Sequence, residues 1–210
     1  MQTKFIISAL AAVAAQLLLP TEGSAQQPAP VSPQVVEAYV KGTWKSPPEG
    51  WQSRIDQDET QKLCSQYRNS PPANIAQNIV AREKATVVFP ADGKVLGNWK
   101  DGEKVAQTGT GGQFTDPPDA VKGGNCYACH QMAAKELSFG TLGPSLVEYG
   151  KIRKYKPEEA KETYAKIFNA QSVQACSNMP RFGYHKFLTE QQMKDVTAYL
   201  FDPESPVNKP

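Results

Sequence analysis

The sequence lacks a strong excess of charge of either sign, because 23 lysines and arginines oppose 21 aspartates and glutamates and leave a net charge of +2. So weak a charge argues against a nucleic-acid partner. Hydrophobic residues make up 40% and charged residues 21% of the chain, which excludes both a disordered chain and a protein with many membrane spans. Histidine and cysteine are scarce, with two and four copies, yet three of these six residues lie within residues 126–130.

The start of the chain carries its one long apolar run. Lys4 precedes this run, residues 5–19, and the small residues 23–25 follow it. This order is typical of a secretory signal that is cut after Ala25. A membrane anchor is the alternative, but the run has only 15 residues, whereas a spanning helix needs about 20. We expect residues 1–25 to be removed and the mature protein to be exported, soluble and periplasmic, with no membrane span.

The next segment, residues 26–114, is predicted to be a mixed extension that packs on the following domain. Ser32 and Pro33 favour the start of a helix there, because serine caps a helix and proline fits its first position. Three structures are expected in all: helices over about residues 32–42 and 53–68, and a short β-hairpin of the β-prone runs 85–89 and 94–99 across the turn 90–93. Residues 102–112 are rich in glycine and are predicted to form a loop.

Residues 115–210 have a helical pattern and are predicted to form a second domain with a C-terminal tail. Pro157 begins one amphipathic helix, with two glutamates in its first turn. Thr189 and Gln192 have the spacing of a capping box at the start of the last helix, which Pro203 ends. The fold class is therefore mainly α.

The motif Cys126-Tyr-Ala-Cys129-His130 is the main functional signal. A random chain of this composition would hold it roughly once in a thousand sequences. Two such thiols can bond to the vinyl groups of a haem, and the adjacent histidine then lies under the iron as its proximal ligand. We predict one covalent haem c. A thioredoxin-like dithiol, which would follow a strand, and a zinc site, which would need a second ligand pair, are the alternatives.

The opposite face of the haem needs a second axial ligand. Three of the four methionines are poor candidates, because one leaves with the signal, one lies two residues after His130 and one lies on a predicted buried helix face: Met1, Met132 and Met193. Met179 remains, and Pro180 favours an extended backbone that can present its side chain from a loop. His185 is the competing ligand, and core packing is the other interpretation of Met179. Ligation by histidine and methionine closes the iron to outside ligands and suits electron transfer.

These features together resemble a class I c-type cytochrome over residues 115–202, and more narrowly the SoxX family, the monohaem subunits of SoxAX cytochrome complexes in sulfur oxidation. The resemblance is carried by five stretches: residues 123–131 (GGNCYACHQ), 143–146 (GPSL) with Tyr149 and Gly150, 175–183 (ACSNMPRFG), 188–192 (LTEQQ) and 202–208 (DPESPVN). It implies a class I cytochrome c helical fold around one haem.

The resemblance also implies partners and a reaction. A SoxX-like chain forms a heterodimer with a SoxA-type cytochrome, and the complex acts as an L-cysteine S-thiosulfotransferase that joins thiosulfate to a cysteine of a SoxYZ-type carrier. The sulfur chemistry belongs to the SoxA-type subunit, and the X haem passes electrons to a downstream acceptor. The sequence agrees with this division, because it shows no separate nucleophile paired with a base. No catalytic residue is expected on this chain.

Four further residues have expected roles. Cys64 and Cys176 are predicted to form a disulfide that fastens the extension to the Met179 loop, and two separate thiols are the alternative. Pro144 is expected to accept a hydrogen bond from His130 through its carbonyl, or else to form a plain turn. Arg181 is a candidate partner for a haem propionate, or a solvated surface residue.

Two other functions remain open. A freestanding periplasmic electron carrier would use the same haem, although it would need little more than the C-terminal domain. A haem enzyme or gas sensor would need an open position on the iron.

Overall fold

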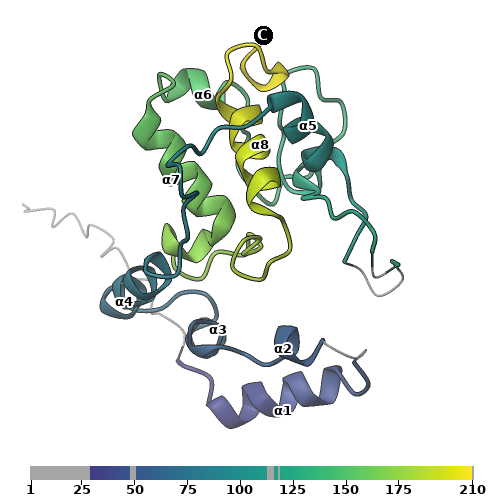
Figure 1. The fold of residues 1–210 in the computed structure, drawn as a ribbon. Helices are drawn as coiled ribbons and strands as arrows, with labels where there is room; N and C mark the ends of the chain where they lie inside the picture. Colours follow the sequence, from purple (N-terminus) through teal and green to yellow (C-terminus); the bar gives the residue numbers. More distant parts are fainter. Residues whose placement is uncertain (1–28, 48–50, 113–115, 118, 210) are drawn as a thin grey trace, which may run out of the picture.

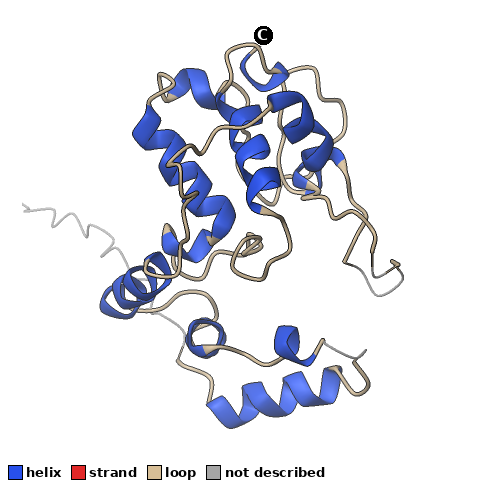
Figure 2. Cartoon of the chain, viewed as in Figure 1, coloured by secondary structure: helices blue, strands red, loops and turns tan. Residues whose placement is uncertain are grey.

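The computed structural model describes residues 29–47, 51–112, 116–117 and 119–209 (Figure 1). The expected signal, residues 1–25, lies outside these residues. Eight α-helices are described: α1 (Pro33–Thr43), α2 (Gln52–Ile55), α3 (Glu59–Gln66), α4 (Ala73–Lys84), α5 (Trp99–Gln107), α6 (Tyr149–Ile152), α7 (Pro157–Phe168) and α8 (Glu190–Phe201). Three 3₁₀ turns accompany them: η1 (Cys126–Ala128), η2 (Ala170–Ser172) and η3 (Pro206–Asn208). No strand occurs in the described part of the chain, so the fold is mainly α (Figure 2).

The main core is built around α8, which packs against α5 on one side and α7 on the other (Figure 1). Helix α8 begins with the predicted capping box of Thr189 and Gln192 and has nearly every later residue buried. The α5–α8 contact is very close at Gly102. A Cβ atom there would lie 2.0 Å from the backbone oxygen of Asp195. Only glycine allows the two backbones to approach in this way.

The C-terminal tail locks α6 to the end of α8 through the buried residue Asn208. The side-chain amide of Asn208 donates to the backbone oxygens of Leu200 and Asp202 at 3.0 and 2.9 Å. Its oxygen accepts from the backbone N–H groups of Gly150 and Lys151. One side chain thus satisfies four backbone groups that the helix ends leave without partners.

The extension contributes α1 to α4, and Figure 1 shows α1, α2 and α3 together below the main core. Helix α4 contacts η2, which directly follows α7. A second, smaller core joins the extension to the rest of the molecule, with Cys64, Ile79 and Cys176 buried in it. Helix α1 follows the prediction, with the Ser32 side chain as its cap and Pro33 as its first residue.

The predicted β-hairpin is wrong. The turn forms, because the N–H of Gly93 donates to the oxygen of Pro90 at 2.9 Å. The two runs beside it do not pair with each other. Phe89 stacks on Tyr164 of α7, and Gly97 and Asn98 donate to α8. The two runs therefore contact helices, through the Phe89 ring and two backbone N–H groups, rather than forming a ladder.

Three helical segments also differ from the prediction. The helix expected over 53–68 is two helices, because α2 ends at Ile55 and Asp58 begins α3 with a capping box. Helix α4 was not predicted. Residues 99–107, assigned mostly to a glycine-rich loop in the extension, form α5 and pack in the main core. The helical core thus begins before the predicted boundary at residue 115.

Candidate functional site

The two cysteines of the motif bracket the single turn η1, which begins at Cys126 and has Cys129 as its C-cap. Asn125, just before it, has a left-handed backbone with φ of 46°, and the N–H of His130 donates to the oxygen of Cys126 at 2.9 Å. Neither cysteine is bridged, and both residues are partly exposed. Burial nevertheless raises the pKa of the Cys126 thiol to about 12. This shift is opposite in direction to the lowered pKa of a reactive thiolate.

The ring of His130 is fixed from two sides. Its Nδ1 atom lies 2.7 Å from the carbonyl oxygen of Pro144, so the ring donates this proton to the backbone and Nε2 is left to ligate a metal. Gly143 packs directly on the ring. A Cβ atom at this position would lie 2.1 Å from Cε1 of His130. The Gly-Pro pair thus sets both the tautomer and the orientation of the proximal histidine.

Tyr127 joins the motif to α8. Its hydroxyl lies 2.5 Å from the hydroxyl of Tyr199, which is fully buried. Burial raises the pKa of both tyrosines, so both are neutral and one hydroxyl donates to the other. This bond holds the motif against the centre of the fold.

Met179 is partly buried and packs against the main core. Met132 and Met193 are core residues, 1% and 3% exposed, as their positions in the sequence suggest. A cavity of about 380 Å³ lies next to this site. It is bounded by the residues just before Cys126 and those just after Met179: Gly123, Gly124, Asn125, Pro180, Arg181 and Phe182. His185 also lines it and makes an edge-to-face contact with Tyr184.

Arg181 has protein partners of its own. Its guanidinium donates to Asp58 at 2.5 Å and to Glu83 at 3.2 Å, and the side chain is 4% exposed. It is therefore not a solvated surface residue. Two carboxylates of the extension occupy both of its terminal nitrogens, whereas Nε is buried without a hydrogen-bond partner. A propionate would therefore compete with these two carboxylates for the guanidinium, which keeps Nε and a second N–H on each terminal nitrogen.

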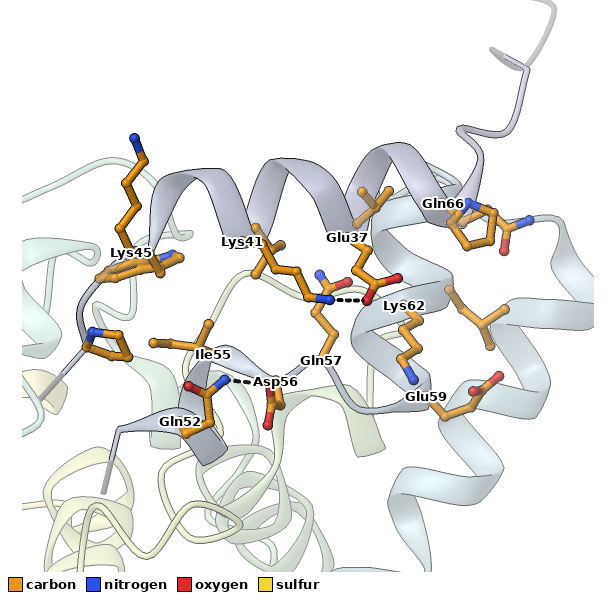
Figure 3. Close-up of a pocket in the computed structure, with 16 residues that line it drawn as sticks. Glu37, Lys41, Lys45, Gln52, Ile55, Asp56, Gln57, Glu59, Lys62 and Gln66 are labelled. Carbon is orange, nitrogen blue, oxygen red and sulfur yellow. Dashed lines mark hydrogen bonds and ion pairs between the residues drawn. The ribbon is translucent and has the colours of Figure 1, made fainter. Parts of the chain in front are cut away.

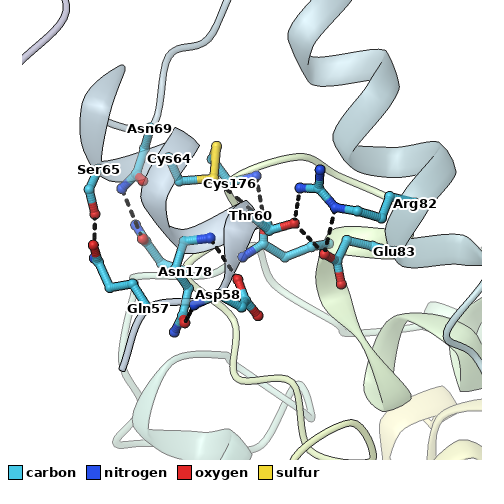
Figure 4. The surroundings of a disulfide bond; sticks show 12 residues. Gln57, Asp58, Thr60, Cys64, Ser65, Asn69, Arg82, Glu83, Cys176 and Asn178 are labelled. Carbon is cyan, nitrogen blue, oxygen red and sulfur yellow. Dashed lines mark hydrogen bonds and ion pairs between the residues drawn. A yellow bond between two sulfur atoms is a disulfide. The ribbon is translucent and has the colours of Figure 1, made fainter. Parts of the chain in front are cut away.

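Cys64 and Cys176 form the predicted disulfide, with sulfurs 2.04 Å apart across a sequence separation of 112 residues (Figure 4). Beside the bridge, the amide of Asn69 donates to the side-chain oxygen of Asn178 at 3.2 Å. The two contacts join Cys176 and Asn178, which lie just before Met179, to the extension.

A larger groove of about 870 Å³ lies between α1 and the α2–α3 segment (Figure 3). Its lining includes apolar residues such as Val40 and Ile55 and the exposed ion pair of Glu37 with Lys41. None of the site residues predicted from the sequence lines this groove. It is therefore separate from the Cys126–Met179 site.

The part of the chain that the structure describes contains no group of three or more His, Cys, Asp or Glu side chains that could hold a metal ion. Across the same residues, no helix has both the length and the apolar character needed to cross a membrane.

The sequence reasoning missed Asp58 and Glu83, the two carboxylates that bind Arg181. Asp58 had a local signal, because Asp58 and Gln61 have capping-box spacing. Glu83 had none, because its partners come from α3, from Asn169 between α7 and η2, and from the Met179 loop, which only the tertiary fold brings together.

Comparison with known proteins covers most of this site. Residues 99–202 match the family described as "Cytochrome c". This match begins at α5 and includes the motif, Met179 and α8. A protein of Aquifex aeolicus (strain VF5), named "Uncharacterized lipoprotein", is 40% identical over 155 residues, which make up 73% of this chain and 73% of that protein.

Proposed function

The chain belongs to the cytochrome c family, and from this we propose that it is the electron-transfer subunit of a SoxAX-type complex that joins thiosulfate to a carrier-protein cysteine. Electron transfer by a covalently bound haem c is the general function of the family. The narrower assignment rests above all on the loop around Met179, residues 175–183, whose sequence ACSNMPRFG resembles the SoxX family.

The residues of the motif suit haem c. Cys126 and Cys129 are the free cysteines, whereas the other two are bridged to each other. His130 has Nδ1 committed to Pro144 and offers Nε2. The cavity beside the motif reaches the residues that follow Met179. Haem c, when bound, supplies an iron that exchanges one electron at a time.

The chain's own residues hold and tune this group. Cys126 and Cys129 would form the two thioethers to the haem, and His130 and Met179 would ligate its iron. The bond from Nδ1 to the Pro144 carbonyl raises the basicity of the proximal histidine. The thioether of Met179 raises the reduction potential relative to a second histidine and leaves no open position on the iron. These properties favour electron transfer over activation of oxygen or peroxide.

The reaction of the complex requires an electron carrier. Joining thiosulfate to a cysteine thiolate forms one S–S bond and releases two electrons. A SoxA-type cytochrome subunit, the expected partner in the heterodimer, carries out the sulfur chemistry on a SoxYZ-type carrier. This chain passes the two electrons one at a time to a downstream acceptor. The thiosulfotransferase activity belongs to the complex, and this chain contributes its redox part.

Export to the periplasm is part of the proposal. The N-terminal residues 1–25 have the pattern of a signal. The name of the Aquifex aeolicus relative, a lipoprotein, supports export. The Cys64–Cys176 bridge also fits an oxidising compartment.

Copurification tests the complex. The protein isolated from thiosulfate-grown cells should elute with a SoxA-type cytochrome in equal amounts. A homogeneous monomer under these conditions would overturn the proposal and favour the second candidate, a freestanding electron carrier. The observation that favours this second candidate is the family match itself, because it requires only residues 99–202.

A further inference from the structure

The segment 176–181, called here the ligand loop, is fastened to the extension at three points. Its first residue, Cys176, is bridged to Cys64 of α3. Asn178 accepts a hydrogen bond from Asn69, in the turn after α3, at 3.2 Å. The third point is its last residue, Arg181. Met179 lies between the second and third points.

Arg181 makes the stronger of the two non-covalent links. It is buried, and its two terminal nitrogens donate to Asp58 of α3 at 2.5 Å and to Glu83 of α4 at 3.2 Å. The guanidinium also lies over the ring of Tyr184, with 3.7 Å between its central carbon and the ring centroid. A planar guanidinium held by two carboxylates and a ring has little freedom to rotate.

Glu83 is itself held rigidly. Its side chain is 5% exposed. Thr60 donates to one carboxylate oxygen, and the amide of Asn169 donates to the other at 2.8 Å. The partner of Arg181 therefore cannot follow the ligand loop if the loop moves outward. Opening the loop would leave a buried carboxylate without its counter-charge, which is a costly arrangement.

We infer that Asp58, Glu83 and Arg181 are positioning residues, and that the extension acts through them and the bridge as a clamp that keeps Met179 on the iron. The inference rests on the proposed function, because it takes Met179 as the axial ligand. It gives the extension a role that a minimal cytochrome core does not require. The clamp acts on the equilibrium between a closed ligand loop and one from which Met179 has dissociated.

Imidazole binding measures this equilibrium, because imidazole reaches the ferric iron only when Met179 leaves. We expect Asp58→Asn and Glu83→Gln in the full-length holoprotein each to raise imidazole affinity about tenfold, the factor for losing a hydrogen bond to a charged group. Neither substitution changes side-chain size appreciably. Asn69→Ala removes the exposed link and should raise the affinity less, and it provides a variant that folds if the buried ones do not.

Two control variants separate the clamp from general stability. Glu37→Gln removes an exposed ion pair of the same extension, on α1, and should leave imidazole affinity unchanged. Val207→Ala opens a cavity at a fully buried residue of η3, at the far end of α8. It should lower the melting temperature without raising imidazole affinity.

The inference would be overturned by unchanged imidazole affinity in Asp58→Asn, Glu83→Gln and Asn69→Ala. It would also be overturned if Val207→Ala raised the affinity as much as these variants do. Failure of the proposed ligation has a different signature. In that case the wild-type protein itself lacks the Met–iron charge-transfer band in its optical spectrum, before any clamp variant is made.

Discussion

At the scale of single residues, the identity of the second axial ligand decides what the iron can do. Met132 and Met193 are enclosed in the main core, whereas Met179 is partly buried on a loop that precedes Pro180. His185 is exposed beside the same cavity and is the alternative ligand.

Replacing Met179 with alanine should open the sixth coordination position of the iron. We expect Met179→Ala to lose the Met–iron charge-transfer band, to lower the reduction potential and to bind CO rapidly in the ferrous state, because no thioether occupies the sixth position. Optical spectroscopy and a redox titration measure these changes. His185→Ala and Met193→Leu are the controls and should keep the band. A band that survives in Met179→Ala, or rapid CO binding by the native protein, would contradict the assignment and favour an open haem site such as that of a sensor.

Substitution of Gly143 is predicted to disturb haem ligation as strongly as substitution of a ligand. A Cβ atom there would overlap the ring of His130, so Gly143→Ala should turn the ring away and sharply reduce the fraction of protein with normally ligated haem. The ratio of haem absorbance to protein, together with the reduction potential, measures the effect. Gly42→Ala is the matched control, because a Cβ atom at Gly42 meets nothing within 4 Å. Native spectra and potential in Gly143→Ala would show that the close contact does not matter.

The carboxyl of Asp58 gives the clamp a pH dependence. Its burial would raise the pKa, but the N–H of Gln61 and the bond and charge of Arg181 lower it more strongly. Since the folded pKa lies below the usual value of about 3.9, this stabilisation is present above that value and is lost as pH falls through the folded pKa. The difference in melting temperature between the wild type and Asp58→Asn should therefore shrink from pH 7 to pH 3. Asparagine keeps the helix cap, so a difference that stays constant over this range would contradict the ion-pair account.

At the scale of elements, capping signals identified helices well and β-propensity did not identify strands. Helices α1 and α8 were predicted because Ser32, Pro33, Thr189 and Gln192 act locally. Helix α5 was missed because Gly102 is typical of a loop, whereas its actual role is a close contact with α8. The predicted hairpin does not form, because Phe89 stacks instead on Tyr164 of the distant helix α7. Such partners are set by tertiary packing, which no local pattern contains.

The bridge between α3 and the ligand loop is predicted to contribute to stability. Changing both Cys64 and Cys176 to serine should lower the free energy of unfolding by about 2 to 5 kcal/mol, because the unfolded chain regains the freedom of a long loop. Denaturant unfolding of the holoprotein measures this loss. Thiol titration of the denatured protein without reductant is an independent check. It should detect no free thiol, and two titratable thiols would contradict the bridge.

At the scale of the whole molecule, the sequence predicted the haem motif but not the contacts between the extension and the ligand loop. The haem motif was evident because its chemistry requires three residues within one turn, and the pairing of His130 with Pro144 follows from the same short region. The clamp was not evident. Its three charged residues lie at the N-cap of α3, on α4 and in the ligand loop, and no local pattern indicates that they meet.

The central claim is that the chain carries electrons from thiosulfate coupling. The most direct test mixes the oxidised protein with a SoxA-type subunit, a SoxYZ-type carrier and thiosulfate, and follows the Met–iron charge-transfer band, which is lost on reduction. We expect the band to disappear only when all three components are present. Persistence of the band while the carrier cysteine acquires thiosulfate, or reduction by thiosulfate alone, would contradict it.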